Sequence, residues 1–378
     1  MENRKKILIV SAPFYPQNSP RANRATELAK EFARQGHDVK VLTVFGDANY
    51  NIIAKDFGIS ISNLGRRKWK SPKFGKSKIG YFLTRAFLRF LSLTIEFPNI
   101  ELTFMVKRAL TLENNYDLMI SSAVPYPVHW GVAASRKKNH QIAKIWIADC
   151  GDPYMGCKTD SFNKLFYFKF IEKWFMHKTD FISVPTEGSI DGYYHEFHHK
   201  IKVIPQGFNF NEAPIYQGVI NNSVPTFAYA GGFIPKIRDP HEFLEFLINI
   251  NIPYKFIIYT RTANIVRPFA LKSNGQIEVL EYISRNDLLF RLSQMDFLVN
   301  FTNGTGVQTP SKLIDYALTK RPILSVGSIN SNFKNAEEFL KANYDGRQVI
   351  DNLEQYNIQT IVSQFLKLLE LEIIKNTR

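Results

Sequence analysis

Short, continuous apolar segments alternate with helical patterns along this chain, and the alternation starts twice. The first apolar segment, residues 7–10, is followed by apolar residues at intervals of three and four, and then by a second apolar segment at 39–45. This spacing is typical of one face of a helix. A strand, a helix and a strand in this order form a parallel pair with a right-handed crossover. Because the strands are apolar throughout, the pattern predicts doubly wound parallel sheets covered by helices on both faces.

The same pattern continues on both sides of a polar segment, 207–225, which is rich in Asn and Pro and is interpreted as a linker. Further strands are expected at 118–121, 142–148, 181–184, 202–205, 227–230, 255–259, 277–280, 297–300 and 323–326. Helices are expected between them, including 128–138, 162–177 and 187–194. The prediction is therefore an α/β chain with two Rossmann-like domains, 1–207 and 208–355. A helix in 356–378 is expected to pack back toward the first domain.

Ligands of doubly wound sheets bind outside the carboxyl ends of the strands. Two such domains facing each other therefore predict one site in a cleft between them.

The charge of the chain favours anionic partners. Lys and Arg outnumber Asp and Glu by 48 to 34 in 378 residues, a net charge of +14. Nucleic acid is not expected, because the sequence has no zinc-finger spacing, basic-region heptads or RNA-binding sheet motif. The two cysteines are interpreted as reduced thiols. The first apolar segment is too short for a signal peptide, so a cytoplasmic protein is expected.

Residues 66–78 contain seven basic residues and no acidic one, and an apolar and basic helix is expected directly afterwards at 81–93. This combination is typical of a segment that docks on an anionic membrane face, which would place the protein on the inner face of the cell membrane. A solvated basic loop followed by a core helix is the alternative.

Several familiar cofactor and metal motifs are missing. No Gly-x-Gly-x-x-Gly follows the first strand, and no P-loop sequence occurs. No two Asp residues have the Asp-x-Asp spacing that commonly holds a divalent cation, the nearest pair being Asp149 and Asp152. The histidines at 195, 198 and 199 have no nearby Cys and are interpreted as a solvated histidine face. Neither a metal nor a dinucleotide cofactor is expected.

The most informative segment is 297–324, where a strand leads through a loop of small residues into a helix. Thr309 is suited to cap this helix and Pro310 to be its first residue. The exposed N–H groups at such a helix end suit a phosphate. Asp315 follows beside an apolar helix face, where it needs a partner such as a ribose diol, unless it points to water.

This segment resembles the Pro-Ser-Lys-Leu-φ-Glu-Tyr signature, with its later Pro, of family four of the retaining glycosyltransferases. Residues 6–44, 180–186, 202–209 and 230–240 resemble other landmarks of that family, in the same order along nearly the whole chain. The resemblance implies the two-domain GT-B fold and a UDP- or GDP-type sugar donor, without a cofactor or metal. It also implies a glycan or lipid-diphosphate-linked acceptor in surface polysaccharide biosynthesis.

The resemblance also implies residues that hold the donor. Asp315 matches the acidic residue on the ribose hydroxyls, and Lys312 is a second cation for the diphosphate. The remaining donor-binding residues that it implies are Gly232, Tyr282, Ile283, Gly306, Val307, Gln308 and Thr309.

Three catalytic residues are implied in the same way. Arg238 matches the basic residue on the diphosphate, Arg21 faces the leaving group, and Asp152 lies near the reacting sugar. Arg24 is a further candidate anion contact.

The chain departs from the family at three places. Val307 stands where a glutamate is common, Lys320 where a glycine is expected, and Ser19-Pro20 where paired glycines are common. A sugar-nucleotide epimerase of the same architecture and a catalytically inactive GT-B partner protein therefore remain as alternatives.

Overall fold

The computed structural model describes residues 4–69, 72, 77–137, 141–157, 162, 164–302, 311–327 and 333–377; for Ser311 and 372–377 it describes the backbone alone. The chain divides into two compact units, here called unit 1 and unit 2. Unit 1 comprises Met1–Phe208 and Tyr356–Arg378, and unit 2 comprises Asn209–Gln355. The divisions fall after residues 208 and 355, next to the predicted boundaries at 207 and 355.

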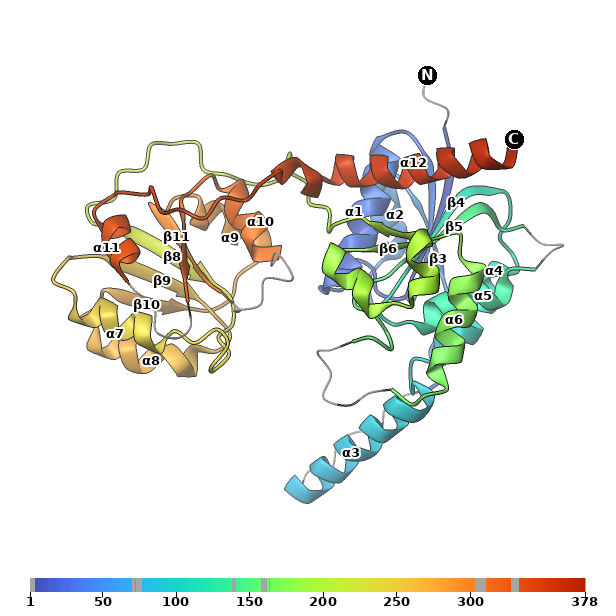
Figure 1. Ribbon diagram of the computed structural model, residues 1–378, viewed down its shortest axis with the longest axis horizontal. Coiled ribbons are helices and arrows are strands. Elements are labelled where there is room, and N and C mark those ends of the chain that lie inside the picture. Colours follow the sequence, from blue (N-terminus) through green and yellow to red (C-terminus); the bar gives the residue numbers. More distant parts are fainter. Residues whose placement is uncertain are drawn as a thin grey trace. The chain divides into compact units, whose positions relative to one another are not determined.

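Unit 1 is built on a parallel seven-stranded sheet in the order β3-β2-β1-β4-β5-β6-β7, with helices on both faces (Figure 1). Its strands are β1 Lys6–Ser11, β2 Asp38–Thr43, β3 Ser60–Asn63, β4 Tyr116–Ser122, β5 Ala143–Asp149, β6 Phe181–Val184 and β7 Ile201–Val203. Its helices are α1 Pro20–Arg34, α2 Tyr50–Phe57, α3 Lys78–Ile95, α4 Glu101–Leu110, α5 Pro127–Ser135, α6 Phe168–Lys178 and α12 Ile358–Thr377.

The central strand β1 contributes to the core on both faces of the sheet. Leu8 and Val10 pack with residues of α4, α5 and α6, whereas Ile7 and Ile9 pack with residues of α1, α2 and α12. Successive side chains of a strand point to opposite faces. A strand buried on both sides therefore has to be apolar at every position, which is the pattern of residues 7–10.

Helix α12 returns to unit 1 after the chain has passed through unit 2. Its apolar side packs against β1 and α1 in the second of these cores. The two connections run together, since Phe208 N donates to Tyr356 O at 2.8 Å and Ile358 N donates to Phe208 O at 2.9 Å. Six side chains of α12 are buried there: Ile358, Ile361, Val362, Phe365, Leu368 and Leu369.

Unit 2 repeats the arrangement with a parallel five-stranded sheet in the order β10-β9-β8-β11-β12. Its strands are β8 Thr226–Ala230, β9 Lys255–Tyr259, β10 Ile277–Leu280, β11 Phe297–Phe301 and β12 Ile323–Val326. Its helices are α7 His241–Asn249, α8 Ala263–Lys272, α9 Arg285–Leu292, α10 Ser311–Leu318 and α11 Lys334–Leu340. In β8, Phe227 and Tyr229 point into one core, and Ala228 and Ala230 point into the other.

The predicted α/β class with two doubly wound parallel sheets is confirmed. One predicted element was wrong: residues 187–194, expected to be helical, form only the short 3₁₀-helix η1 Glu187–Gly192. Two of its six residues are Gly188 and Gly192, and glycine in a helix interior costs about 1 kcal/mol relative to alanine. In the part of the chain that is described, no helix combines the length and the apolarity that crossing a bilayer requires.

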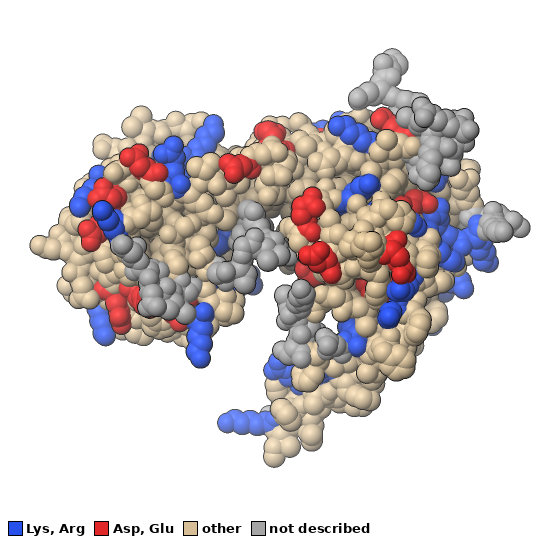
Figure 2. All heavy atoms as spheres, in the orientation of Figure 1, with Lys and Arg blue, Asp and Glu red and all other residues tan. Residues whose placement is uncertain are grey.

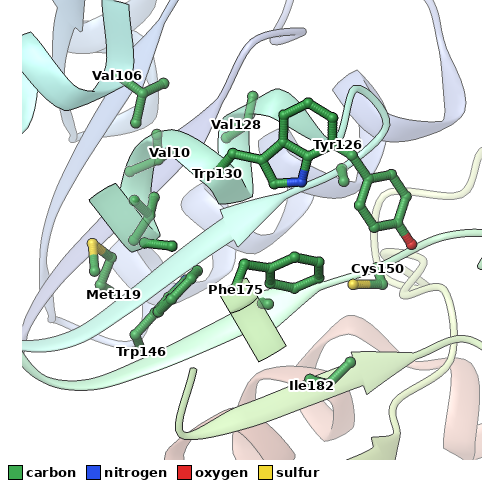
Figure 3. Close-up of a cluster of buried hydrophobic side chains, with 14 of the residues drawn as sticks. Val10, Val106, Met119, Tyr126, Val128, Trp130, Trp146, Cys150, Phe175 and Ile182 are labelled. Carbon is green, nitrogen blue, oxygen red and sulfur yellow. The ribbon is translucent and has the colours of Figure 1, made fainter. Parts of the chain in front are cut away.

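An aromatic cluster fills the core of unit 1 beneath α5 and α6 (Figure 3). Trp130 of α5 and Phe175 of α6 lie over Met119 and Trp146 of the sheet, and the hydroxyl of Tyr126 points toward the segment that follows β5. The cluster thus packs against the carboxyl end of β5 on the side of the sheet that α5 and α6 cover.

Candidate functional site

A tight turn follows the carboxyl end of β8 and places Arg238 near that strand. Arg238 N donates to Ile234 O at 2.8 Å, and Ile234 N donates to Arg238 O at 3.2 Å, so the turn closes on itself. Asp239 fixes the turn to the start of α7, because its carboxylate accepts from Lys236 N at 3.1 Å and from His241 N at 3.2 Å. Arg238 is thereby positioned by backbone hydrogen bonds on both sides.

Gly231, directly after β8, has a backbone conformation that residues with a side chain rarely adopt. Its φ is +152°, and a Cβ at this position would lie 2.8 Å from the hydroxyl oxygen of Tyr229. That hydroxyl donates to Gly232 O at 3.0 Å. A Cβ at Gly232 would meet nothing within 4 Å, so the space beside this glycine is open.

The side chains of Arg238 and Lys312 both lie next to Tyr229, and we call these two residues the cation pair. The Lys312 ammonium lies 4.8 Å from the centre of the Tyr229 ring, and Arg238 lies near the Tyr229 hydroxyl. Arg238 Nε and Lys312 Nζ are both buried and have no hydrogen-bond partner among the described residues. Burial and the neighbouring Arg238 charge lower the pKa of Lys312 to about 7. Two adjacent buried cations without a carboxylate are costly unless an anion joins them.

Asp315 faces α9 from the first turns of α10 and forms an ion pair. Its Oδ1 accepts from Arg285 Nε at 3.0 Å and from Arg285 Nη2 at 2.5 Å. Burial raises the pKa of Asp315, and the Arg285 charge counteracts this rise. The neighbouring Tyr316 fixes α10 to the end of β8, because Ala230 N donates to its hydroxyl oxygen at 2.8 Å. The acid is therefore held at the same edge of the sheet as the cation pair.

A surface hollow of about 430 Å³ opens at the carboxyl ends of β9 and β10. Tyr282 lines it, and the Arg261 guanidinium stacks on the Tyr282 ring at 4.9 Å. The other lining residues are Thr260, Ala263, Arg267, Val279, Leu280 and Glu281. A half-exposed aromatic ring with a stacked guanidinium offers a flat surface suited to another planar group.

In unit 1 the carboxyl end of β5 carries a buried ion pair. Asp149 is fully buried, and its carboxylate accepts from Arg24 Nε at 2.7 Å, from Arg24 Nη2 at 2.7 Å and from Ser183 Oγ at 2.7 Å. The Arg24 and Arg21 charges outweigh burial and lower the pKa of Asp149. Arg24 also donates to the carbonyls of Ile204 and Pro205, at 3.1 and 2.6 Å. Arg24 is thus a structural residue, which corrects its prediction as an anion contact.

Arg21 lies beside this ion pair. Its Nη1 is 3.5 Å from Asp149 Oδ2, its side chain is 19% exposed, and it passes so close to Gly151 that any side chain there would collide with it. The next residue, Asp152, is exposed, and its carbonyl accepts from Tyr126 Oη at 2.7 Å. Arg21 and Asp152 therefore share one edge of the unit 1 sheet.

No protein-family model matches this sequence, and no curated protein is detectably similar to it. Solved structures do match its architecture along almost the whole chain. TarM superposes with a TM-score of 0.61 at 12% identity, covering 97% of this chain and 99% of that one. The lipopolysaccharide outer core galactosyltransferase WaaB gives a TM-score of 0.56 at 10% identity, covering 97% and 99%. Anabaena Alr3699/HepE, solved with UDP and glucose, gives 0.51 at 12% identity, covering 99% and 100%. The chain has the GT-B fold.

Within the GT-B chain, the site residues predicted for unit 2 fall in three groups along one sheet edge. Arg238, Lys312 and Gly232 lie around Tyr229 at the end of β8. Asp315 lies beside Arg285, and Tyr282 lines the hollow after β10. Ile283 is packed against the adjacent core rather than lining that hollow. Gly306, Val307, Gln308 and Thr309 lie outside the described residues.

Sequence reasoning missed four residues that contact or position the candidate site residues. Tyr229, Arg285 and Tyr316 act through contacts with residues 30 to 90 positions away in the chain, and Asp149 acts through Arg24. No local spacing marks such pairs. A charged residue at the last position of an apolar strand, as Asp149 is, was the one available signal.

Proposed function

We propose that this chain is a retaining glycosyltransferase of the family-four type, which moves a sugar from a UDP- or GDP-type donor to a glycan or lipid-linked acceptor. The reaction proposed needs no metal ion and no cofactor. The proposed setting is surface polysaccharide biosynthesis at the cytoplasmic side of the membrane.

The observation that carries the proposal is the cation pair on Tyr229. Arg238 Nε and Lys312 Nζ are buried cationic nitrogens without a hydrogen-bond partner among the described residues, beside an open stretch of backbone at Gly232. A diphosphate has the charge and the number of acceptor oxygens that would satisfy both cations. Asp315 lies along the same sheet edge, where a carboxylate suits the hydroxyls of a ribose.

Two of the three compared proteins support this proposal through their own activity or ligands. One is a galactosyltransferase of the lipopolysaccharide outer core, and one was solved with UDP and glucose. Their identity to this chain is 10–12%, so what they carry over is the fold, and the chemistry depends on the residues of this chain.

The proposed chemistry is stabilisation of the leaving diphosphate. When the bond between the sugar and the diphosphate breaks, negative charge grows on the phosphate oxygens, and fixed cations in a buried site lower the energy of that transition state. Arg238 and Lys312 would supply this charge, and the donor's own phosphate would accept the proton of the acceptor hydroxyl. Arg21 and Asp152 are proposed as the catalytic residues of unit 1.

A thermal-shift screen against a panel of nucleotide sugars tests donor binding first. A ligand present at about 100 times its dissociation constant stabilises the folded state by about 2.7 kcal/mol. One UDP- or GDP-sugar should raise the melting temperature, and the unmodified wild-type protein should keep its activity with that donor in EDTA. If no nucleotide sugar binds, the proposal fails.

Arg238→Ala tests the role of the cation pair. Turnover should fall at least about tenfold with the fold intact, because each lost charge contact to a transition state typically costs 10²–10³ in rate. Arg347→Ala, at an exposed position of the same unit, is the matched control and should keep full activity. Product analysis with and without acceptor separates a transferase from an epimerase, and donor binding without any turnover would indicate an inactive homologue.

A further inference from the structure

Helix α3 of unit 1 is exposed along its whole length. It projects from the body of the unit (Figure 1), and none of its eighteen residues, all of them described, is buried. A helix in a water-soluble domain normally buries an apolar stripe against the core. An amphipathic helix without such a partner is therefore a candidate docking element.

Four of the exposed apolar side chains of α3 share one side of the helix. Ile79, Leu83, Phe87 and Phe90 follow each other at intervals of three and four, and they are 74%, 61%, 55% and 60% exposed. Residues at these intervals lie on the same side of a helix. We call these four residues the α3 apolar face.

The basic residues of α3 lie along another side of the helix, where the exposed Tyr81 and Phe82 also lie. Lys78, Arg85 and Arg89 follow each other at intervals of seven and four and form a stripe along the helix. No acidic residue occurs between Asp56 and Glu96, whereas nine Lys and Arg residues do. In Figure 2 the surface of the projecting helix is tan and blue, without red.

The end of α3 is fixed to the body of unit 1. Glu96, the buried residue that follows the helix, accepts from Tyr154 Oη at 2.8 Å and pairs with Lys164. Lys164 also donates to Ser92 O at 3.3 Å, and Tyr167 donates to Thr94 O. The projection is thus anchored through a buried carboxylate at its base, while no described residue buries the apolar face.

We propose that α3 docks unit 1 on an anionic lipid bilayer, lying in the interface with its apolar face among the acyl chains and its basic stripe at the head groups. The excess of positive charge selects an anionic surface, and it opposes pairing with a second copy of the same helix. Basic amphipathic helices with large apolar side chains bind membranes in this way. The docking does not depend on the proposed transferase activity.

Sedimentation of the full chain with vesicles tests the proposal. The protein should bind vesicles of phosphatidylcholine and phosphatidylglycerol, much less those of phosphatidylcholine alone, and binding should weaken with salt. Leu83→Ser with Phe90→Ser should reduce partitioning at least about tenfold, since burying each large apolar side chain is worth more than that factor. Arg85→Glu should reduce it at least about fivefold. The matched control is Leu112→Ser, because Leu112 is 83% exposed elsewhere on unit 1.

A gain of signal complements these losses. Phe87→Trp should show a blue-shifted fluorescence difference spectrum with anionic vesicles, and Leu112→Trp should show none. Equal binding of wild type and the Leu83→Ser, Phe90→Ser variant would overturn the proposal. So would self-association through α3 without any vesicle binding. Donor binding, measured in parallel, separates either outcome from a failure of the proposed enzymatic function.

Discussion

Replacing Lys312 with methionine should make the unliganded protein more stable, although the same lysine is proposed to bind the donor. The Lys312 ammonium is buried over the Tyr229 ring next to Arg238 and has no hydrogen-bond partner among the described residues. Methionine has nearly the same length, keeps the contact with the ring and removes the charge. The substitution therefore isolates the free-energy cost of the amine.

The magnitude follows from the pKa. Burial and the Arg238 charge lower the pKa of Lys312 from 10.5 to about 7. Each pKa unit corresponds to about 1.4 kcal/mol, so the full cost to the folded state is at most about 5 kcal/mol. Relaxation and water entry reduce such costs, and we expect Lys312→Met to raise the free energy of unfolding by about 1–3 kcal/mol at pH 7.

The direction of the pKa shift decides how the free energy of unfolding changes with pH. Because the folded-state pKa lies below the unfolded-state value, the unfolded chain binds more protons between pH 7 and 10.5. Lys312 therefore makes the wild-type stability rise with pH across this window. The advantage of Lys312→Met should be full at pH 7 and nearly gone at pH 10.

Urea unfolding followed by circular dichroism at both pH values measures the effect. Lys272→Met, at an exposed position of α8, is the matched control and should change nothing. A Lys312→Met variant that is no more stable than wild type at pH 7, or whose advantage is the same at pH 10, would refute the reasoning.

Two further predictions concern the positioning of the site. Arg24→Met leaves the Asp149 carboxylate buried without its main partner, so the free energy of unfolding of unit 1 should fall by about 3–5 kcal/mol. Urea denaturation measures this loss, and adding Asp149→Leu should restore part of it; no recovery would contradict the ion-pair explanation. Gly231→Ala should destabilise unit 2 by about 1–3 kcal/mol, because φ is +152° and the new Cβ would meet Tyr229. Gly232→Ala, where nothing lies within 4 Å, should melt at the wild-type temperature, and equal melting of both variants would argue against the strain at Gly231.

The fold could be predicted because its signals are local. Continuous apolar strands such as 7–10, helix stripes and stop signals such as Gly36 each depend on a few neighbouring residues. Helix α1 illustrates this: Ser19 accepts from Ala22 N at 3.2 Å, and Pro20 is the first helical residue. Both choices are set by backbone geometry within four positions.

The roles of individual charges could not be predicted in the same way. From the sequence, Arg21 was a candidate catalytic residue and Arg24 a further candidate anion contact, three residues apart. Arg24 is enclosed by Asp149 and the carbonyls of Ile204 and Pro205, whereas Arg21 keeps an exposed edge. The difference is decided by residues more than 120 positions away, whose burial changes the cost of a charge.

Hydrophobic periodicity and capping act over short distances, so the two parallel sheets, most of their helices and the chemical types of the candidate site residues could be predicted from the sequence. The three-dimensional packing was needed to show which charges are paired, which stay uncompensated and which apolar helix remains uncovered. Those outcomes depend on what lies across each side chain in space: Tyr229 beneath Lys312, Arg285 against Asp315, and no covering element over α3 among the described residues.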